Sequence, residues 1–81
     1  MKTIRFNDNR NIVSQRVRIE RERLGLSQEA LATKLQMKGV GIDQQAISKI
    51  ERNARIVTDY ELLCLADVFG ISVDELLEGH A

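Results

Sequence analysis

The chain has 81 residues, of which 43% are hydrophobic and 30% charged, and its 12 Lys and Arg balance its 12 Asp and Glu. This length favours one domain with a modest core. No stretch approaches the roughly 18 consecutive apolar residues of a membrane-spanning helix, and the N-terminus lacks the apolar segment of a secretory signal. The single cysteine, Cys64, excludes an internal disulfide framework and favours a reducing, cytoplasmic environment.

The neutral net charge conceals a strong asymmetry. Residues 1–55 carry all 12 basic residues and six acidic ones, which gives +6, whereas residues 56–81 carry the other six acids and no Lys or Arg, which gives −6. A molecule divided in this way can approach a polyanion with one end and keep its acidic end away. The alternative is that the division merely reflects solvated helix faces.

Residues 1–11 predict an extended N-terminal arm, followed by a domain over residues 12–78 and a tail over 79–81. The arm alternates briefly between apolar and polar residues and ends in a cluster of Asn and Asp, which is typical of a turn. We expect Ile4 and Phe6 to pack onto the domain or a partner. The alternative interpretation is a basic arm that touches DNA through Lys2, Arg5 and Arg10.

Residues 12–24 predict the first helix, because apolar side chains recur at roughly helical spacing. These are Ile12, Val13, Val17, Ile19 and Leu24. Gly25 fits a left-handed helix end, with Leu26 folding back as its hydrophobic contact. The charged residues expected on the exposed faces of this helix are Arg16, Arg18, Glu20, Arg21, Glu22 and Arg23.

A second helix is predicted to begin after Ser27, whose hydroxyl can accept a hydrogen bond from the backbone of the first turn. Its apolar side consists of Ala30, Leu31, Ala32 and Leu35, and Met37 could continue it. The connection over residues 37–42 contains two glycines, and we expect its Val40 and Ile42 to turn inward.

Asp43 is the predicted N-cap of a third helix over residues 44–52, with Ile47 and Ile50 on its buried side. Asn53 follows where a left-handed cap is needed.

Two capping boxes are predicted from residue spacing, one from Thr58 to Glu61 and one from Ser72 to Glu75. Two further helices are therefore predicted over residues 59–69 and 73–78. The first of these two is the most apolar helix, which predicts broad burial, and Gly70 closes it. We expect Leu76 and Leu77 of the last helix to face inward. The five helices predict an all-α fold.

Three stretches resemble one known family: LGLSQEALATKL, QQAISKIERNAR and TDYELLCLADVFGISVDELL. They are similar to the helix-turn-helix of the phage λ repressor and Cro type, also called the XRE family, over about residues 13–77. The resemblance implies a compact five-helix, λ-repressor-like domain that binds double-stranded DNA as a transcription regulator, typically a repressor and commonly a homodimer.

The same resemblance implies roles for individual residues. Gln28 matches a glutamine that holds a phosphate and supports the residues that read bases. The implied base contacts are Gln44, Gln45, Ser48 and Lys49, and the implied backbone contacts besides Gln28 are Arg21, Arg52 and Arg55. Physical chemistry agrees, because glutamine pairs bidentately with adenine and lysine suits the acceptors of guanine.

One departure concerns the turn. Leu35 and Ile47 are 12 positions apart, about five more than is usual in the family, so either the second helix extends through Met37 or the turn bulges outward. This leaves open which of Gln44 and Gln45 leads into the groove. Ala46 offers no hydrogen bond and could touch only a thymine methyl.

The sequence gives no support for an enzyme, a metal site or a cofactor. His80 lies in the tail without a second ligand at metal-binding spacing, and no nucleophile and base pair can be assembled. Glu51 is interpreted as a structural partner of a nearby arginine, and Cys64 as a small buried residue.

The competing function is an antitoxin or a protein-interaction module of the same fold, but the polar outer residues of the second and third helices favour DNA. For a dimer, the two candidate surfaces are the Ile4–Phe6 arm and the acidic end with Leu76 and Leu77.

Overall fold

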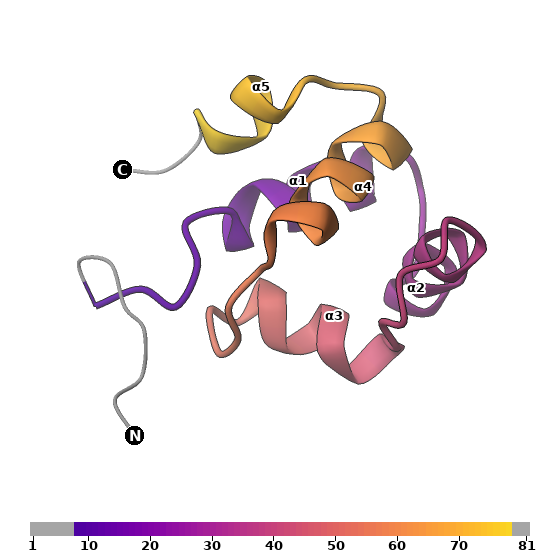
Figure 1. The fold of residues 1–81 in the computed structure, drawn as a ribbon, viewed down its shortest axis with the longest axis horizontal. Helices are drawn as coiled ribbons and strands as arrows, with labels where there is room; N and C mark the ends of the chain where they lie inside the picture. The colour runs from indigo at the N-terminus through magenta and orange to yellow at the C-terminus, as the bar shows by residue number, and fades with distance from the viewer. Residues whose placement is uncertain (1–7, 79–81) are drawn as a thin grey trace.

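The computed structural model describes residues 8–78, which form five α-helices (Figure 1). Their order is α1 (Ser14–Arg23), α2 (Gln28–Met37), α3 (Gln44–Glu51), α4 (Asp59–Phe69) and α5 (Val73–Leu77). The predicted all-α class and the number of helices are therefore confirmed. The first helix is shorter than expected, because it begins two residues later and ends one residue earlier.

Four of the helices begin as the capping residues predict. The side chains of Ser27, Asp43, Thr58 and Ser72 each accept a hydrogen bond from the backbone N–H three residues later. At Thr58 and Ser72 the reciprocal bond of the capping box is also present. Because local chemistry defines these starts, the three helices after residue 42 begin where the sequence places them.

The first four helices end with the same backbone motif. In α1, α2 and α3 the residue after the cap is left-handed, with φ of 69° at Gly25, 87° at Gly39 and 58° at Asn53, and in α4 the cap itself is left-handed, with φ of 71° at Gly70. The next amide then bonds to a carbonyl five residues back, as from Leu26 to Arg21 and from Ala54 to Lys49. These are Schellman closures. Asn53 is the non-glycine residue among them, as predicted.

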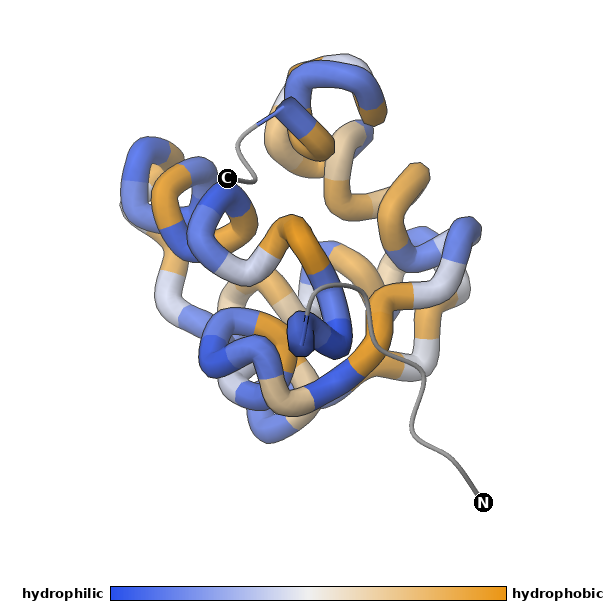
Figure 2. Tube along the Cα trace, turned by 90° about the vertical axis from the view of Figure 1, so that its left-hand side faces the viewer, coloured by the Kyte–Doolittle hydropathy of each residue, from blue (hydrophilic) through white to orange (hydrophobic). Residues whose placement is uncertain are grey.

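The core lies where α1, α2, α3 and α4 meet, and α5 packs on α1 and α4. Its largest fully buried side chains include Leu31, Leu35, Ile47, Ile50 and Leu65. Hydrophobic and hydrophilic stretches follow one another along the trace (Figure 2), and each helix contributes at least one buried side chain. None of the described helices is long and apolar enough to cross a membrane.

Five apolar residues are more exposed to solvent than predicted. Met37 is 81% exposed, Leu63 61%, Ile19 53% and Leu24 40%, while Cys64 is only partly buried. Helical geometry explains the largest difference, because Met37 lies about 200° around α2 from the buried Leu35. On α4 the predicted broad burial holds for most apolar residues but fails at Leu63.

Glu20 is less exposed than predicted. It was expected on the surface, but it is buried at 5% exposure. It is three residues after Val17 and thus on the inward side of α1. Arg16 and Arg23 hold its carboxylate at 2.9 and 2.6 Å. Burial raises the pKa of Glu20, but the hydrogen bonds from Arg23 and Arg16 outweigh it, so the pKa lies below its usual value.

The long connection between α2 and α3 results from a longer α2 and an inward-folded loop. α2 runs through Met37, and Gly39 closes it. Val40 and Ile42 are then buried at 4% and 1% exposure, as predicted. The side-chain amide of Gln36 donates to the Ile42 carbonyl at 2.8 Å. The additional residues are thus packed against the core instead of separating the two helices, and α2 and α3 remain in contact.

Candidate nucleic-acid interface

A chain of polar contacts connects the first three helices and runs from Glu51, the last residue of α3, back to Gln44, its first. Arg21 donates from two nitrogens to the Glu51 carboxylate, at 2.6 and 3.0 Å, and from a third to the Leu26 carbonyl at 2.8 Å. Glu51 accepts from the Gln28 amide at 3.2 Å, and the Gln28 oxygen accepts from Gln44 at 2.7 Å. The first turn of α3 is therefore joined through α2 to a mostly buried ion pair.

The Arg21–Glu51 ion pair fixes this chain in place. The two side chains are 13% and 5% exposed, and the bidentate geometry is the strongest that arginine and carboxylate adopt. The hydrogen bond to Glu51 raises the pKa of Arg21 above its usual value. The interpretation of Glu51 as a structural partner of a nearby arginine is confirmed.

The outer side of α3 is polar and largely exposed. Gln44, Gln45 and Lys49 are exposed, and Ser48 is partly buried. Together with Arg52 these residues line one shallow hollow. Arg52 donates from Nε to the Ser48 hydroxyl at 3.3 Å. The structure thus brings together the four residues predicted to read bases and one predicted backbone contact.

The two glutamines at the start of α3 differ in their surroundings. Gln44 donates to Gln28, whereas Gln45 has no side-chain hydrogen bond within residues 8–78. Lys49 likewise has no ion pair among the described residues. Both exposed side chains retain their full hydrogen-bonding capacity for an external partner.

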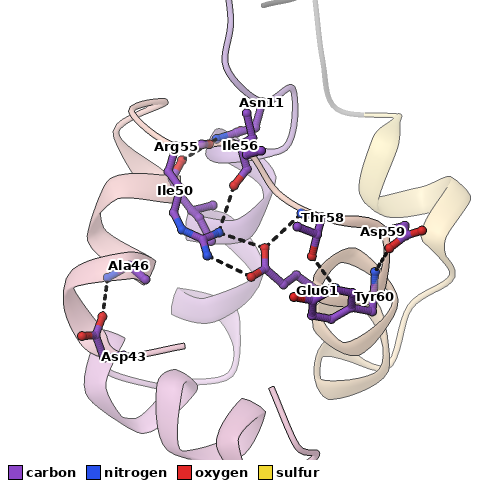
Figure 3. A network of polar contacts seen from close by, with 10 residues as sticks. All are labelled: Asn11, Asp43, Ala46, Ile50, Arg55, Ile56, Thr58, Asp59, Tyr60 and Glu61. Atoms are coloured by element: carbon purple, nitrogen blue, oxygen red, sulfur yellow. Dashed lines mark hydrogen bonds and ion pairs between the residues drawn. The ribbon is translucent and has the colours of Figure 1, made fainter. Parts of the chain in front are cut away.

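Arg55 lies beyond the far end of α3 and is held by α4 (Figure 3). It donates to both carboxylate oxygens of Glu61, at 2.8 and 2.9 Å, and to the Ile56 carbonyl. The hydrogen bonds from Arg55 hold the pKa of Glu61 below its usual value, although burial acts in the opposite direction. Arg55, like Arg21, is thus bound to a nearly buried carboxylate, and both remain predicted backbone contacts.

The arm is described only from residue 8 onward, so Lys2, Arg5, Ile4 and Phe6 lie outside the described residues. Arg10 is at the C-terminal end of α3, where its backbone N–H donates to Asn53 at 2.9 Å and its guanidinium to the Ala54 carbonyl at 3.2 Å. The sequence offered one signal for this contact, the cluster of asparagines before α1, which was interpreted only as a turn.

Comparisons with known proteins agree with this geometry. The sequence pattern of the Helix-turn-helix family matches residues 17–76. The P22 c2 repressor protein, solved in complex with a synthetic operator, is 32% identical with a TM-score of 0.71, over 84% of this chain and 96% of that one. SinR, a master regulator for biofilm formation solved in complex with DNA, is 30% identical with a TM-score of 0.70, over 82% and 98%.

The DNA-binding domain of BldD from S. venezulae is 30% identical with a TM-score of 0.69, over 88% of this chain and 99% of that one. A comparison of the sequence with curated proteins finds no match. The fold, the matched residues and these three structures together establish that the chain belongs to the λ-repressor and Cro-like (XRE) family of helix-turn-helix DNA-binding proteins.

Proposed function

We propose that this DNA-binding transcription regulator reads double-stranded DNA by inserting the outer side of α3 into the major groove, and that it acts as a repressor in the cytoplasm. One observation carries the proposal. Gln44 is held by Gln28 while Gln45 and Lys49 are exposed beside it. Helix-turn-helix proteins contact base edges with the N-terminal residues of the second helix of the motif.

The roles within this surface follow from chemistry. Gln45 and Gln44 can each make a bidentate contact to adenine, and Lys49 can donate to guanine O6 and N7. Arg52 suits phosphate because it is exposed at the end of α3, and Gln28 in the first turn of α2 would contact a phosphate while its side-chain amide also donates to Glu51. Arg21 and Arg55 would reach a phosphate only by sharing donors that bind carboxylates, so we rank them below Arg52.

Homodimerisation on the operator is the second part of the proposal. Leu76 is fully buried and Leu77 partly buried, so the end of α5 is a poor docking surface. By contrast Tyr60 and Leu63, three residues apart on α4, are 58% and 61% exposed, and Ile56 in the segment before α4 is 41% exposed. A patch of this kind covers at most a few hundred Å², whereas a stable interface buries about 800 Å² per partner. We therefore propose a dimer that is weak in solution and forms on DNA.

The antitoxin alternative requires a protein-binding surface in addition to the DNA surface. The outer residues of α3 are polar or basic, which supports DNA as the partner of this surface.

Selection of bound duplexes from a random pool tests the proposed function. We expect enrichment of one motif, present as two inverted half-sites whose centres are about one helical turn, or roughly 34 Å, apart. A pool that stays random after repeated selection would contradict sequence-specific reading. Enrichment of a single isolated half-site would retain the reading and contradict the dimer.

A further inference from the structure

Asn53 does more than end α3. Its backbone has the left-handed conformation of the helix end, with φ of 58°, which glycine adopts at least as readily. Its side chain is used elsewhere, because Oδ1 accepts from the backbone N–H of Arg10 and Asn11, at 2.9 and 3.1 Å, and Nδ2 donates to Asn9 at 2.5 Å. The asparagine side chain therefore binds a segment more than 40 positions away.

Asn11 completes the attachment from the other side. It is 8% exposed, and its side-chain amide donates to the carbonyls of Ile50 and Arg55, at 3.1 and 2.8 Å (Figure 3). Its oxygen accepts from the N–H of Val13 at the start of α1. Asn9, Asn11 and Asn53, which we name the asparagine clamp, thus tie the chain before α1 to the end of α3.

The asparagine clamp determines where Arg10 lies. The two residues flanking Arg10 are both in the clamp, its backbone N–H is bound by Asn53, and its guanidinium reaches the Ala54 carbonyl at 3.2 Å. The other guanidinium nitrogens have no hydrogen bond within residues 8–78. Arg10 is in no ion pair among these residues, which distinguishes it from Arg55 and its Glu61 partner.

We propose that Asn53 is a positioning residue for DNA binding, which acts through the asparagine clamp to hold Arg10 against a phosphate beside the bases read by α3. This inference rests on the proposed function and adds a phosphate contact to the same interface. A guanidinium held in advance at the end of α3 loses less side-chain entropy on binding than an exposed, mobile one. The clamp would thereby connect the position of the arm to that of α3.

The test compares Asn53→Gly, Arg10→Gln and the double variant in the full chain. Glycine retains the left-handed backbone at position 53 and removes only the side-chain bonds. The measurement is fluorescence anisotropy with a labelled 20-base-pair duplex between 50 and 200 mM KCl. Arg10→Gln removes one phosphate contact per protomer, which should lower the magnitude of the salt slope by about 0.9 for each bound protomer.

Asn53→Gly changes no charge, yet we expect it to lower the slope as Arg10→Gln does, and the double variant to show no further loss. Lys34→Gln is the charge-matched control on α2, and it should keep the original slope. A slope unchanged by Asn53→Gly, or effects of the two substitutions that add fully, would overturn the inference. Circular dichroism of each variant checks that it is folded at the temperature of measurement.

Failure of the inference is distinguishable from failure of the proposed function. If the original chain binds the duplex with a steep salt slope and Arg10→Gln leaves that slope intact, Arg10 makes no phosphate contact and the proposed function stands. If the original chain does not bind the duplex, the proposed function itself is contradicted.

Discussion

Gln44 and Gln45 are adjacent and chemically identical, but their surroundings differ, and we propose different tasks for them on this ground. The bond from Gln44 to Gln28 fixes one side chain before DNA arrives, and Gln28 is in turn fixed by Glu51. Gln45 keeps both ends of its amide available to a base. The turn length alone left this choice open, and the structure provides a physical reason to rank Gln45 first for discrimination between bases.

Gln45→Ala should therefore cost about 1–3 kcal/mol of binding free energy at the selected duplex and little on unrelated duplexes, because a bidentate base contact is lost. Competition anisotropy with both kinds of duplex measures the difference. Gln15→Ala, which removes an exposed glutamine on α1, is the matched control. Equal weakening on every sequence would instead assign Gln45 to phosphate positioning.

Particular residues also show which features could be predicted from the sequence and which could not. The four caps were predicted because each depends on a side chain and a backbone three residues apart. The burial of Glu20 was missed because it requires two arginines to neutralise the carboxylate, and charge alternation resembles an exposed surface. The asparagine clamp was missed because its partners are more than 40 positions apart.

At the level of elements, two ion pairs with nearly buried carboxylates hold the C-terminal end of α3. Arg21 and Glu51 join α1 to α3, while Arg55 and Glu61 join the segment after α3 to α4. A buried pair is costly to break when one partner is removed, because the other charge remains without compensation. These contacts fix the C-terminal end of α3 relative to α1 and α4.

The Arg55–Glu61 pair predicts a pH dependence of stability. The folded-state pKa of Glu61 lies below its usual value of 4.5, so its contribution is complete above that value and is lost as pH falls through the lower, folded pKa. Glu20 contributes in the same direction. The free energy of unfolding should therefore decrease from about pH 5 downward, where the unfolded chain begins to bind more protons.

Glu61→Gln should lower stability at pH 7 and flatten this decrease. Urea unfolding followed by circular dichroism between pH 7 and pH 3 measures both effects. Glu22→Gln is the control, since Arg18 and Glu22 are 64% and 57% exposed and such pairs contribute little. An undiminished decrease below pH 5 in Glu61→Gln would contradict the assignment.

At the scale of the whole molecule, ion pairs determine which of the cations in the basic part of the chain are available to DNA. Many of the cations in residues 1–55 are paired with acids, and in the described part of the chain the unpaired ones are Arg10, Lys34, Lys49 and Arg52. Three of these lie on α3 or at its end. Lys38, by contrast, is paired with Asp67, which raises its pKa. The sequence places the positive charge in residues 1–55. Within the described part of the chain, the structure shows that most of the unpaired cations lie around α3.

Leu63→Glu tests the proposed dimer surface. It should abolish cooperative binding to the two-half-site duplex and leave binding to a single half-site nearly unchanged, because the substitution places like charges opposite each other across the interface. Analytical ultracentrifugation with labelled DNA gives the number of protomers bound. Ile19→Glu is the control, an exposed apolar residue on α1. Loss of cooperativity with Ile19→Glu instead would place the interface elsewhere.

The most direct test of the central claim, that the cationic surroundings of α3 bind the DNA backbone while α3 reads bases, is a salt titration of the chain on its selected duplex. If a dimer contacts about six phosphates, with Arg10 and Arg52 of each protomer among the contacting residues, affinity should fall about 10³-fold or more between 50 and 200 mM salt. An affinity that stays flat across this range would contradict the account.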